Sequence, residues 1–370
     1  MAHSSTLMAS AFKFLNSINK WALYLVIFIW PFGHLLKFSG VYLLDIACIL
    51  SFIAFVLGDN IKRFRNTLLF KSLNLFWFSL LVSILYSLWR QSVVTPNLNF
   101  LYFLRALVYP FLAFSFSTHW SADLKKASFF SILLFLCFGI VQYLILPDLR
   151  LYKNLGFDDH YYRLAGTLLD PNFTGAILAT FIIFFLTTKK YLLSIVFLTC
   201  LTLTFSRASY LAFLLTLIPL VFQKKAFKLF LLLPLLALLI YVSPKPFGEG
   251  VNLLRTYSIS SRATSWGNGL QLFAKKPVMG NGFGHLTGDL GQKVSVDNSY
   301  IYLLAGSGLL GLASFIFVLF AVLKTINKNT YLLLLPILIH SIFNNSLFYI
   351  WIMALFWILV GFSLKENKSA

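Results

Sequence analysis

Long apolar runs separated by short polar intervals make up most of this sequence. A helix needs about 20 apolar residues to cross the hydrocarbon core of a bilayer, and most of the runs approach this length. Only 11% of the residues are charged, whereas soluble globular domains carry roughly 25%. We therefore predict an all-α polytopic membrane protein that forms a single integral-membrane domain over residues 1–370.

The basic clusters of the short intervals support about twelve membrane-spanning helices. With twelve spans, these clusters all fall on one side of the membrane, and the positive-inside rule makes that side, with both termini, cytoplasmic. The rule also accounts for the net charge of +19 without a nucleic-acid partner. The predicted segments are 15–36, 41–57, 68–89, 98–117, 126–146, 172–188, 191–205, 208–222, 226–242, 297–323, 330–343 and 346–363.

This topology places two long polar intervals outside, a loop at 147–171 and a larger loop at 243–296. A third outer feature is Ser206-Arg207, between two short apolar segments. Most of the carboxylates lie in or beside the two loops, and several arginines lie in these outer parts against the positive-inside bias. The guanidinium group suits phosphate oxygens, so the arginines indicate a phosphate-bearing ligand. The alternative is that each arginine reaches lipid headgroups or pairs with a carboxylate. The residues concerned are Arg150, Arg163, Arg207, Arg255, Arg262, Asp148, Asp158, Asp159, Asp170, Glu249, Asp289 and Asp297.

Four short motifs follow one another between about residues 160 and 360. In order and predicted topology they resemble those of the O-antigen ligase and polysaccharide polymerase superfamily of bacterial inner membranes. One position departs from the ligase branch, where a histidine usually stands in place of Asp297. The motifs are Arg163-Leu-Ala-Gly166 with Asp170-Pro-Asn172, Ser206-Arg207-Ala208, Ser261-Arg262 with Trp266, Pro277, Gly280, Gly282 and Gly284, and Asn298-Ser299-Tyr300 with Gly306, Gly308 and Gly311.

The resemblance implies a GT-C-like ligase or polymerase fold with one large periplasmic loop. It implies a glycosyltransferase that moves a glycan from undecaprenyl diphosphate to an acceptor hydroxyl at the periplasmic face of the bacterial inner membrane. The acceptor is another glycan in an O-antigen polymerase and the lipid A core in an O-antigen ligase. The aspartate at position 297 favours the polymerase and leaves the ligase open. Membrane lipids are the other expected partners, in lipopolysaccharide or other surface polysaccharide biosynthesis.

For such a transfer the leaving diphosphate needs positive charge, from either a metal ion or fixed cations. The outer intervals contain no His, Asp and Glu set at metal-ligand spacing. We therefore predict a reaction without metal or other cofactor, in which Arg163, Arg207 and Arg262 bind the diphosphate.

The acceptor hydroxyl must also lose a proton. Asp297 is the first candidate for the general base, because a partly buried carboxylate has a raised pKa that suits a base. The alternative is that Asp297 caps the following helix. His285 is the second candidate for the base. The residues expected to support the site are Arg105, Asn172, Asn298 and Tyr300.

A transporter or flippase of a lipid-linked or anionic solute is the competing function. Charged residues inside apolar segments are typical of transport pathways, and Asp45 and Arg105 lie in such segments. Transporters place their polar residues near the middle of the bilayer. Most polar residues here gather on one outer side instead, which favours the enzyme.

Overall fold

The computed structural model describes residues 2–38, 41–90, 95–155, 160–246, 249–288 and 291–369. Asp158, Asp159 and Asp289, three of the acidic residues noted above, lie outside these ranges. The described residues are almost entirely helical, as predicted. The two short strands β1 (Lys37–Phe38) and β2 (Val41–Tyr42) form one antiparallel pair.

Every predicted apolar segment overlaps one or two of the helices. The α-helices of the described chain are α1 (Ala2–Ile29), α2 (Leu43–Leu57), α3 (Leu68–Trp89), α4 (Pro96–Val108), α5 (Phe111–His119), α6 (Ala122–Ile145), α7 (Pro171–Thr187), α8 (Tyr191–Leu203), α9 (Arg207–Lys224), α10 (Leu232–Val242), α11 (Tyr257–Lys275), α12 (Ser299–Thr325), α13 (Lys328–His340) and α14 (Ile350–Ser369). Short 3-10 helices are η1 (Trp30–Leu35), η2 (Asn60–Arg63), η3 (Arg150–Leu155), η4 (Gly166–Leu168), η5 (Phe227–Leu231) and η6 (Glu249–Val251).

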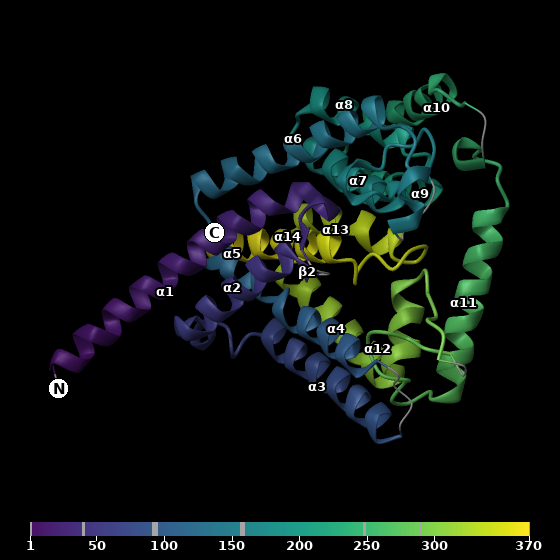
Figure 1. Cartoon of the computed structure of the whole chain (residues 1–370). Helices are drawn as coiled ribbons and strands as arrows, with labels where there is room; N and C mark the ends of the chain where they lie inside the picture. The colour runs from purple at the N-terminus through teal and green to yellow at the C-terminus, as the bar shows by residue number, and fades with distance from the viewer. Residues whose placement is uncertain are drawn as a thin grey trace.

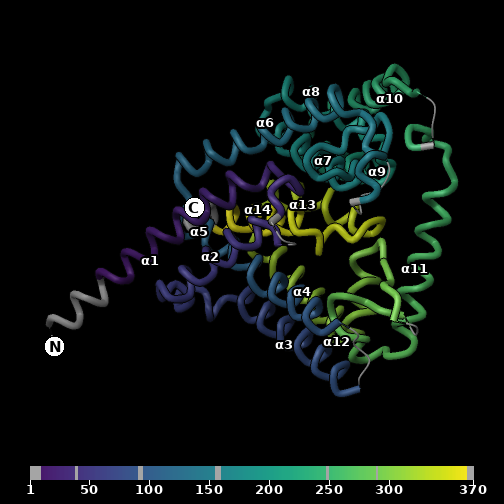
Figure 2. The backbone as a smooth tube through the Cα atoms, in the orientation of Figure 1, coloured from purple at the N-terminus to yellow at the C-terminus, as the bar shows by residue number. Residues whose placement is uncertain are grey.

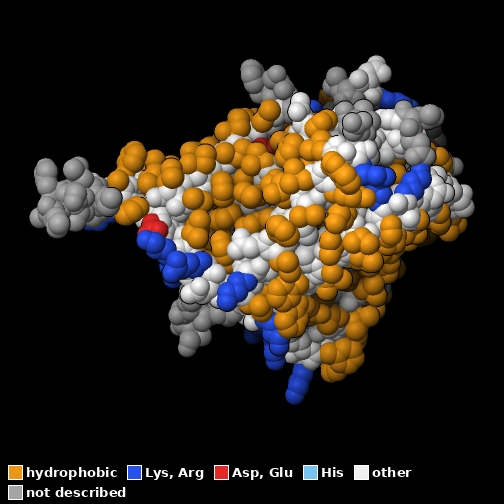
Figure 3. All heavy atoms as spheres, turned by 90° about the horizontal axis from the view of Figure 1, so that it is seen from below, with side chains coloured by type: hydrophobic (Ala, Val, Ile, Leu, Met, Phe, Trp, Pro, Cys, Tyr) orange, Lys and Arg blue, Asp and Glu red, His pale blue; other side chains and the backbone are white. Residues whose placement is uncertain are grey.

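Four helical stretches of the described residues are long and apolar enough to cross a membrane. They are α3, α6, α12 and the stretch Pro96–His119, which combines α4 and α5. Further apolar helices are shorter. The surface in Figure 3 is mainly hydrophobic on the visible face, as expected for contact with lipid tails. The chain is thus a helical membrane protein, while twelve spans and a periplasmic loop stay predictions.

Two features of the helices were not predicted. The first is a break between α4 and α5, which contains Pro110. Proline has no backbone N–H and therefore cannot continue the hydrogen bonding of a helix. The larger polar loop also contains a full helix, α11. Only Ser265, Gly269 and Leu272 of α11 are buried, so it has no long apolar run by which to recognise it. Figure 2 shows α11 along one side of the bundle, running from near α9 and α10 towards α12.

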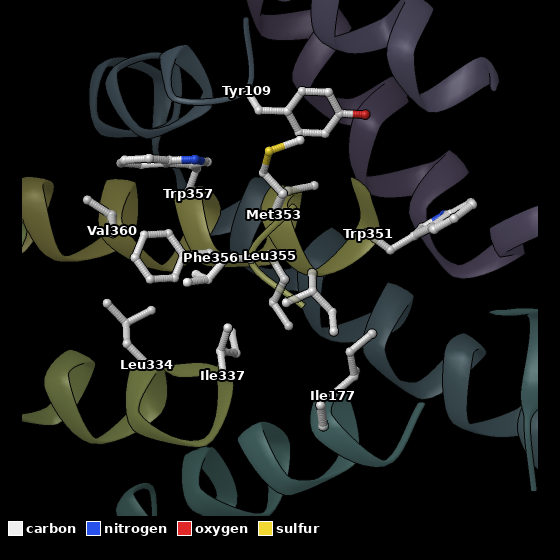
Figure 4. Close-up of a cluster of buried hydrophobic side chains, with 14 of the residues drawn as sticks. Tyr109, Ile177, Leu334, Ile337, Trp351, Met353, Leu355, Phe356, Trp357 and Val360 are labelled. Carbon is white, nitrogen blue, oxygen red and sulfur yellow. The ribbon is translucent and has the colours of Figure 1, made fainter. Parts of the chain in front are cut away.

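The last two helices lie at the centre of the molecule. In Figure 1, α13 and α14 run between α3, α4 and α12 on one side and α6 to α9 on the other. Trp351, Leu355 and Phe356 of α14 belong to the buried cluster in Figure 4. The Trp351 carbonyl accepts a hydrogen bond from the Trp30 indole at 2.9 Å. Most residues of α14 between 350 and 364 are buried, and the helix connects the two halves.

The glycine motifs join α12 to the loop that precedes it. Gly308 has φ +65° and kinks α12. The N–H groups of Leu309 and Leu310 beyond the kink donate to the carbonyls of Pro277 and Val278, at 2.8 and 3.3 Å. Broken membrane helices need such substitute partners because lipid supplies none.

Gly280 and Gly308 lie where no side chain fits. A Cβ at Gly280, which has φ +73°, would approach the Gly306 carbonyl oxygen to 2.3 Å, and a Cβ at Gly308 would approach the Val278 oxygen equally closely. The glycine-rich turn therefore packs closely against α12.

We expect Gly280→Ala and Gly308→Ala each to destabilise the protein by about 2–5 kcal/mol, through the positive φ and the backbone clash. Thermal unfolding in detergent measures this loss. Gly267→Ala is the matched control, because nothing lies within 4 Å of its Cβ position in α11. Alanine there should be neutral or stabilise by about 0.5–1 kcal/mol. Equal effects at all three glycines would contradict the proposed packing role.

Candidate active site

A cavity of about 1360 Å³ opens among the two polar loops and the turn between α13 and α14. The start of α7 contributes Asn172 and Phe173, and the start of α11 contributes Arg262. The turn contributes Asn344 and Tyr349. The loops at 147–171 and 243–296, remote in sequence, therefore do meet at one site.

The cavity carries an excess of positive charge. Its described lining contains six Lys and Arg residues and two carboxylates. Such an excess attracts and stabilises an anion. The cationic residues are Arg150, Lys153, Arg163, Arg255, Arg262 and Lys293, and the carboxylates are Asp170 and Asp297.

Arg163 is the most buried of these cationic residues, with 4% of its surface exposed. Its Nε donates to the Thr204 carbonyl at 2.8 Å, and one terminal nitrogen donates to the Phe205 carbonyl at 3.4 Å. Arg255 donates to the same Phe205 carbonyl at 3.0 Å. Burial lowers the pKa of Arg163 to about 9, and the charge of Arg255 contributes. Arg163 still stays protonated at neutral pH, and an added anion would relieve the repulsion between the two cations.

Arg262 projects from α11 towards the turn between α13 and α14. Its Nε donates to the Phe343 carbonyl at 2.9 Å, and one terminal nitrogen contacts the Ser258 carbonyl at 3.4 Å. Burial lowers the pKa of Arg262, while the negative charge of Asp297 opposes this shift. The arginine and the candidate base are thus close enough to interact electrostatically.

Arg207, the third predicted diphosphate ligand, does not belong to the described lining of the cavity, whereas Arg163 and Arg262 do. Its guanidinium donates to the Leu253 carbonyl at 3.1 Å and to the Ser258 hydroxyl. These contacts fix the segment between η6 and α11. Arg207 therefore holds in place the segment that carries Arg255 and leads to Arg262.

The helix cap at the start of α12 is Asn298, so the alternative that Asp297 caps this helix is wrong. The Asn298 side-chain oxygen accepts from the N–H groups of Tyr300 and Ile301 at 2.9 and 3.0 Å. Its amide donates to the Ile342 carbonyl at 2.8 Å. The backbone N–H of Asp297 donates to the Ser265 hydroxyl at 2.8 Å, and this bond helps to fix the residue against α11. Its carboxylate lines the cavity.

We expect Asn298→Ala to destabilise the protein by about 1–2 kcal/mol, because it removes both the cap and the bond to Ile342. Thermal unfolding measures the loss, and transfer activity should fall as well, since Asp297 is the neighbouring residue. Ser121→Ala removes the cap of α6, away from the cavity, and serves as control. It should reduce stability and leave activity of the folded protein unchanged. Unchanged activity in Asn298→Ala would show that the cap does not position Asp297.

His285 and Asn172 line the same cavity. The His285 Nδ1 is 2.8 Å from the Thr95 hydroxyl. Burial lowers the pKa of His285, and the charge of Lys293 adds to this, so the ring is neutral at neutral pH. The Asn172 side-chain oxygen accepts from the Ser206 hydroxyl at 3.1 Å and thereby ties the start of α7 to that of α9.

Arg105 and Tyr300, two predicted supporting residues, do not belong to the described lining. Arg105 forms an ion pair with Asp45 at 2.6 Å, and Tyr109 donates to the same carboxylate at 2.8 Å. The Tyr300 hydroxyl donates to the Leu338 carbonyl at 3.0 Å and links α12 to α13. Both residues therefore act in helix packing.

The structure adds residues that the motifs did not single out as site residues. Arg255 was recognised only as one of several outer arginines. Asp170 lies near Arg163 and Arg262, and its side chain also caps α7. The rings of Phe173 and Tyr349 stack with centroids 3.9 Å apart and form an aromatic surface in the cavity. The turn between α13 and α14 could have been recognised from the polar residues in the short interval 341–346.

Among the residues that the structure describes, no group of three or more His, Cys, Asp or Glu side chains is placed to hold a metal ion. The cations that face the cavity are Lys and Arg side chains.

The fold and the site define a polytopic helical membrane protein with a cationic cavity beside its helix ends. Residues 192–316, about a third of the chain, match the O-antigen ligase family model. This match confirms the predicted resemblance to the O-antigen ligase and polymerase superfamily. The matched segment runs from α8 into α12 and contains Arg207, Arg255, Arg262 and Asp297. No curated protein matches the chain.

Proposed function

We propose that the protein transfers a glycan from undecaprenyl diphosphate to an acceptor hydroxyl in this cavity, at the periplasmic face of the bacterial inner membrane. The observation that carries the proposal is the convergence of three arginines, a carboxylate and a neutral histidine on one space of about 1360 Å³. Those residues are Arg163, Arg255, Arg262, Asp297 and His285.

In the proposed reaction the acceptor oxygen forms a bond to the anomeric carbon of the donor glycan. The bond between that carbon and the phosphate oxygen breaks, and undecaprenyl diphosphate leaves with the electron pair. Asp297 takes the proton of the acceptor hydroxyl. Arg163, Arg255 and Arg262 stabilise the leaving diphosphate, since fixed donors stabilise developing charge without reorganising.

Two residues have secondary roles in this proposal. Arg207 positions the segment that carries Arg255, through its contacts with Leu253 and Ser258. His285, neutral at neutral pH, is the alternative base. The positive charges replace a metal ion in the proposed reaction, so transfer should persist with excess chelator.

The polymerase is favoured over the ligase because Asp297 stands where ligases usually carry histidine. The transporter alternative rested on Arg105 and Asp45. These residues form an ion pair with each other, and neither belongs to the described lining of the cavity, which supports the enzyme over the transporter.

The decisive experiment incubates purified protein with lipid-linked oligosaccharide and acceptor, without ATP and with EDTA. Release of undecaprenyl diphosphate with a longer lipid-linked glycan supports the polymerase. Transfer to lipid A core supports the ligase instead. If neither substrate is consumed and lipid-linked glycan crosses a vesicle membrane, the protein is a transporter and the proposal is wrong.

A further inference from the structure

A second cavity, of about 720 Å³, lies among α6, α7, α13 and α14. It is at the opposite end of two helices that reach the active-site cavity. Helix α7 presents Phe173 to the active site and Thr187 to this second cavity. Helix α13 begins at the second cavity, with Thr330, and ends at the turn that closes the first. The two cavities are therefore separate.

The interior of this second cavity is apolar and aromatic. Phe181 and Phe184 of α7, Leu333 of α13 and Leu359 of α14 are among its walls. Trp30 also lines it. Walls of this kind bind a hydrocarbon chain, because covering them removes apolar surface from water.

Its outer part is cationic. Lys125, Lys126 and Lys190 line it and are exposed. The Lys190 ammonium lies 4.2 Å from the centre of the Phe129 ring, which orients it. No acidic residue belongs to the described lining. These lysines belong to the basic clusters predicted to be cytoplasmic, and clustered lysines on that side attract anionic lipid headgroups.

Thr330 adds a buried hydroxyl without a partner. Its side chain is in the lining and 1% exposed, and its Oγ1 has no hydrogen-bond partner. Other hydroxyls of the lining are satisfied: those of Ser128, Ser131 and Thr187 donate to backbone carbonyls at 2.8–2.9 Å. An unbonded buried hydroxyl is unfavourable, so Thr330 points to a ligand that supplies an acceptor oxygen.

We infer that this cavity binds one anionic diacyl phospholipid of the cytoplasmic leaflet. The phosphate contacts Lys125, Lys126 and Lys190, an ester oxygen accepts from Thr330, and an acyl chain fills the apolar interior. The ester oxygen distinguishes this lipid from a polyprenyl phosphate. Thr330 is buried, whereas the three lysines are exposed. A ligand whose phosphate contacts the lysines therefore needs a second acceptor oxygen, deeper in the cavity, to bond to Thr330. The hydrocarbon chain of a polyprenyl phosphate has no such oxygen.

Native mass spectrometry of the purified protein tests this inference. The probes are phosphatidylglycerol and phosphatidylcholine with the same acyl chains. We expect one retained phosphatidylglycerol, preferred over phosphatidylcholine by at least about tenfold, because only the former has a net negative charge. Equal retention of the two lipids would overturn the inference, as would preferred retention of undecaprenyl phosphate in a parallel sample.

A triple variant with Lys125→Gln, Lys126→Gln and Lys190→Gln should lose most of this preference. The matched control removes three exposed basic residues from the interval before and within α3, by Arg63→Gln, Arg65→Gln and Lys71→Gln, and should retain it. Equal retention in the two triple variants would contradict the lysine contacts.

Thr330→Val removes the hydroxyl and keeps the shape of the side chain. Without the lipid it should be neutral or stabilising, because the unbonded hydroxyl is gone. With phosphatidylglycerol the variant should gain less thermal stability than the wild type. An equal gain would show that Thr330 does not contact the lipid.

Discussion

Arg262→Ala is expected to lower glycan transfer by about 100- to 1,000-fold, the usual effect of removing one donor that stabilises developing charge. The side chain lines the cavity, and its Nε is held by the Phe343 carbonyl at 2.9 Å. Arg262→Lys should recover only part of the activity, because an ammonium group lacks the planar fork that binds two phosphate oxygens. Single-turnover transfer from lipid-linked oligosaccharide measures the loss.

Both arginines, Arg163 and Arg262, donate to backbone carbonyls, but Arg163 is buried whereas Arg262 is partly exposed. Arg262 is therefore the better test, because its removal should disturb the fold less. The control is Arg90→Ala, at an exposed arginine beyond α3 that does not belong to the described lining. It should leave transfer unchanged. Full activity of a folded Arg262→Ala protein would refute the role of this arginine in binding the diphosphate.

Asp297→Asn is expected to lower transfer by about 100- to 10,000-fold, since it removes the general base and keeps the shape of the side chain. Asparagine has nearly the same size, and the backbone bonds of residue 297 to Ser265 and Trp266 do not depend on the carboxylate, so the variant should fold and bind donor. Donor binding and single-turnover rate should therefore separate, with only the rate reduced. A reduced affinity at an unchanged rate would assign Asp297 to substrate binding.

Asp297→His tests the same residue by keeping a base at this position, with a different pKa. Imidazole is also a base, with an ordinary pKa of about 6.5 against about 3.9 for an aspartate. The variant should recover part of the activity lost in Asp297→Asn, and the acidic limb of its pH–rate profile should move to higher pH. His285→Ala is the comparison. If it abolishes transfer while Asp297→Asn does not, the histidine is the base.

The helices were predictable because membrane insertion depends on local composition. The run 68–89 is predominantly apolar, and α3 occupies that range. Helix α11 was not predicted, because it is amphipathic and contains few buried residues. It is therefore polar on average and has no apolar run. The alternative that Asp297 caps α12 was one residue early, since Asp297 and Asn298 are both good capping residues and only the backbone geometry distinguishes them.

The sequence by itself determined the membrane class, the positions of the apolar helices and the likeness to the ligase and polymerase superfamily, because these depend on composition and local order. Only the tertiary structure decided which arginines share a cavity. Arg207 and Arg255 both belong to outer intervals, but Arg207 bonds to the segment before α11 while Arg255 lines the site. That difference follows from the packing of α9, α11 and the turn after α13, which are far apart in sequence, and no local pattern records it.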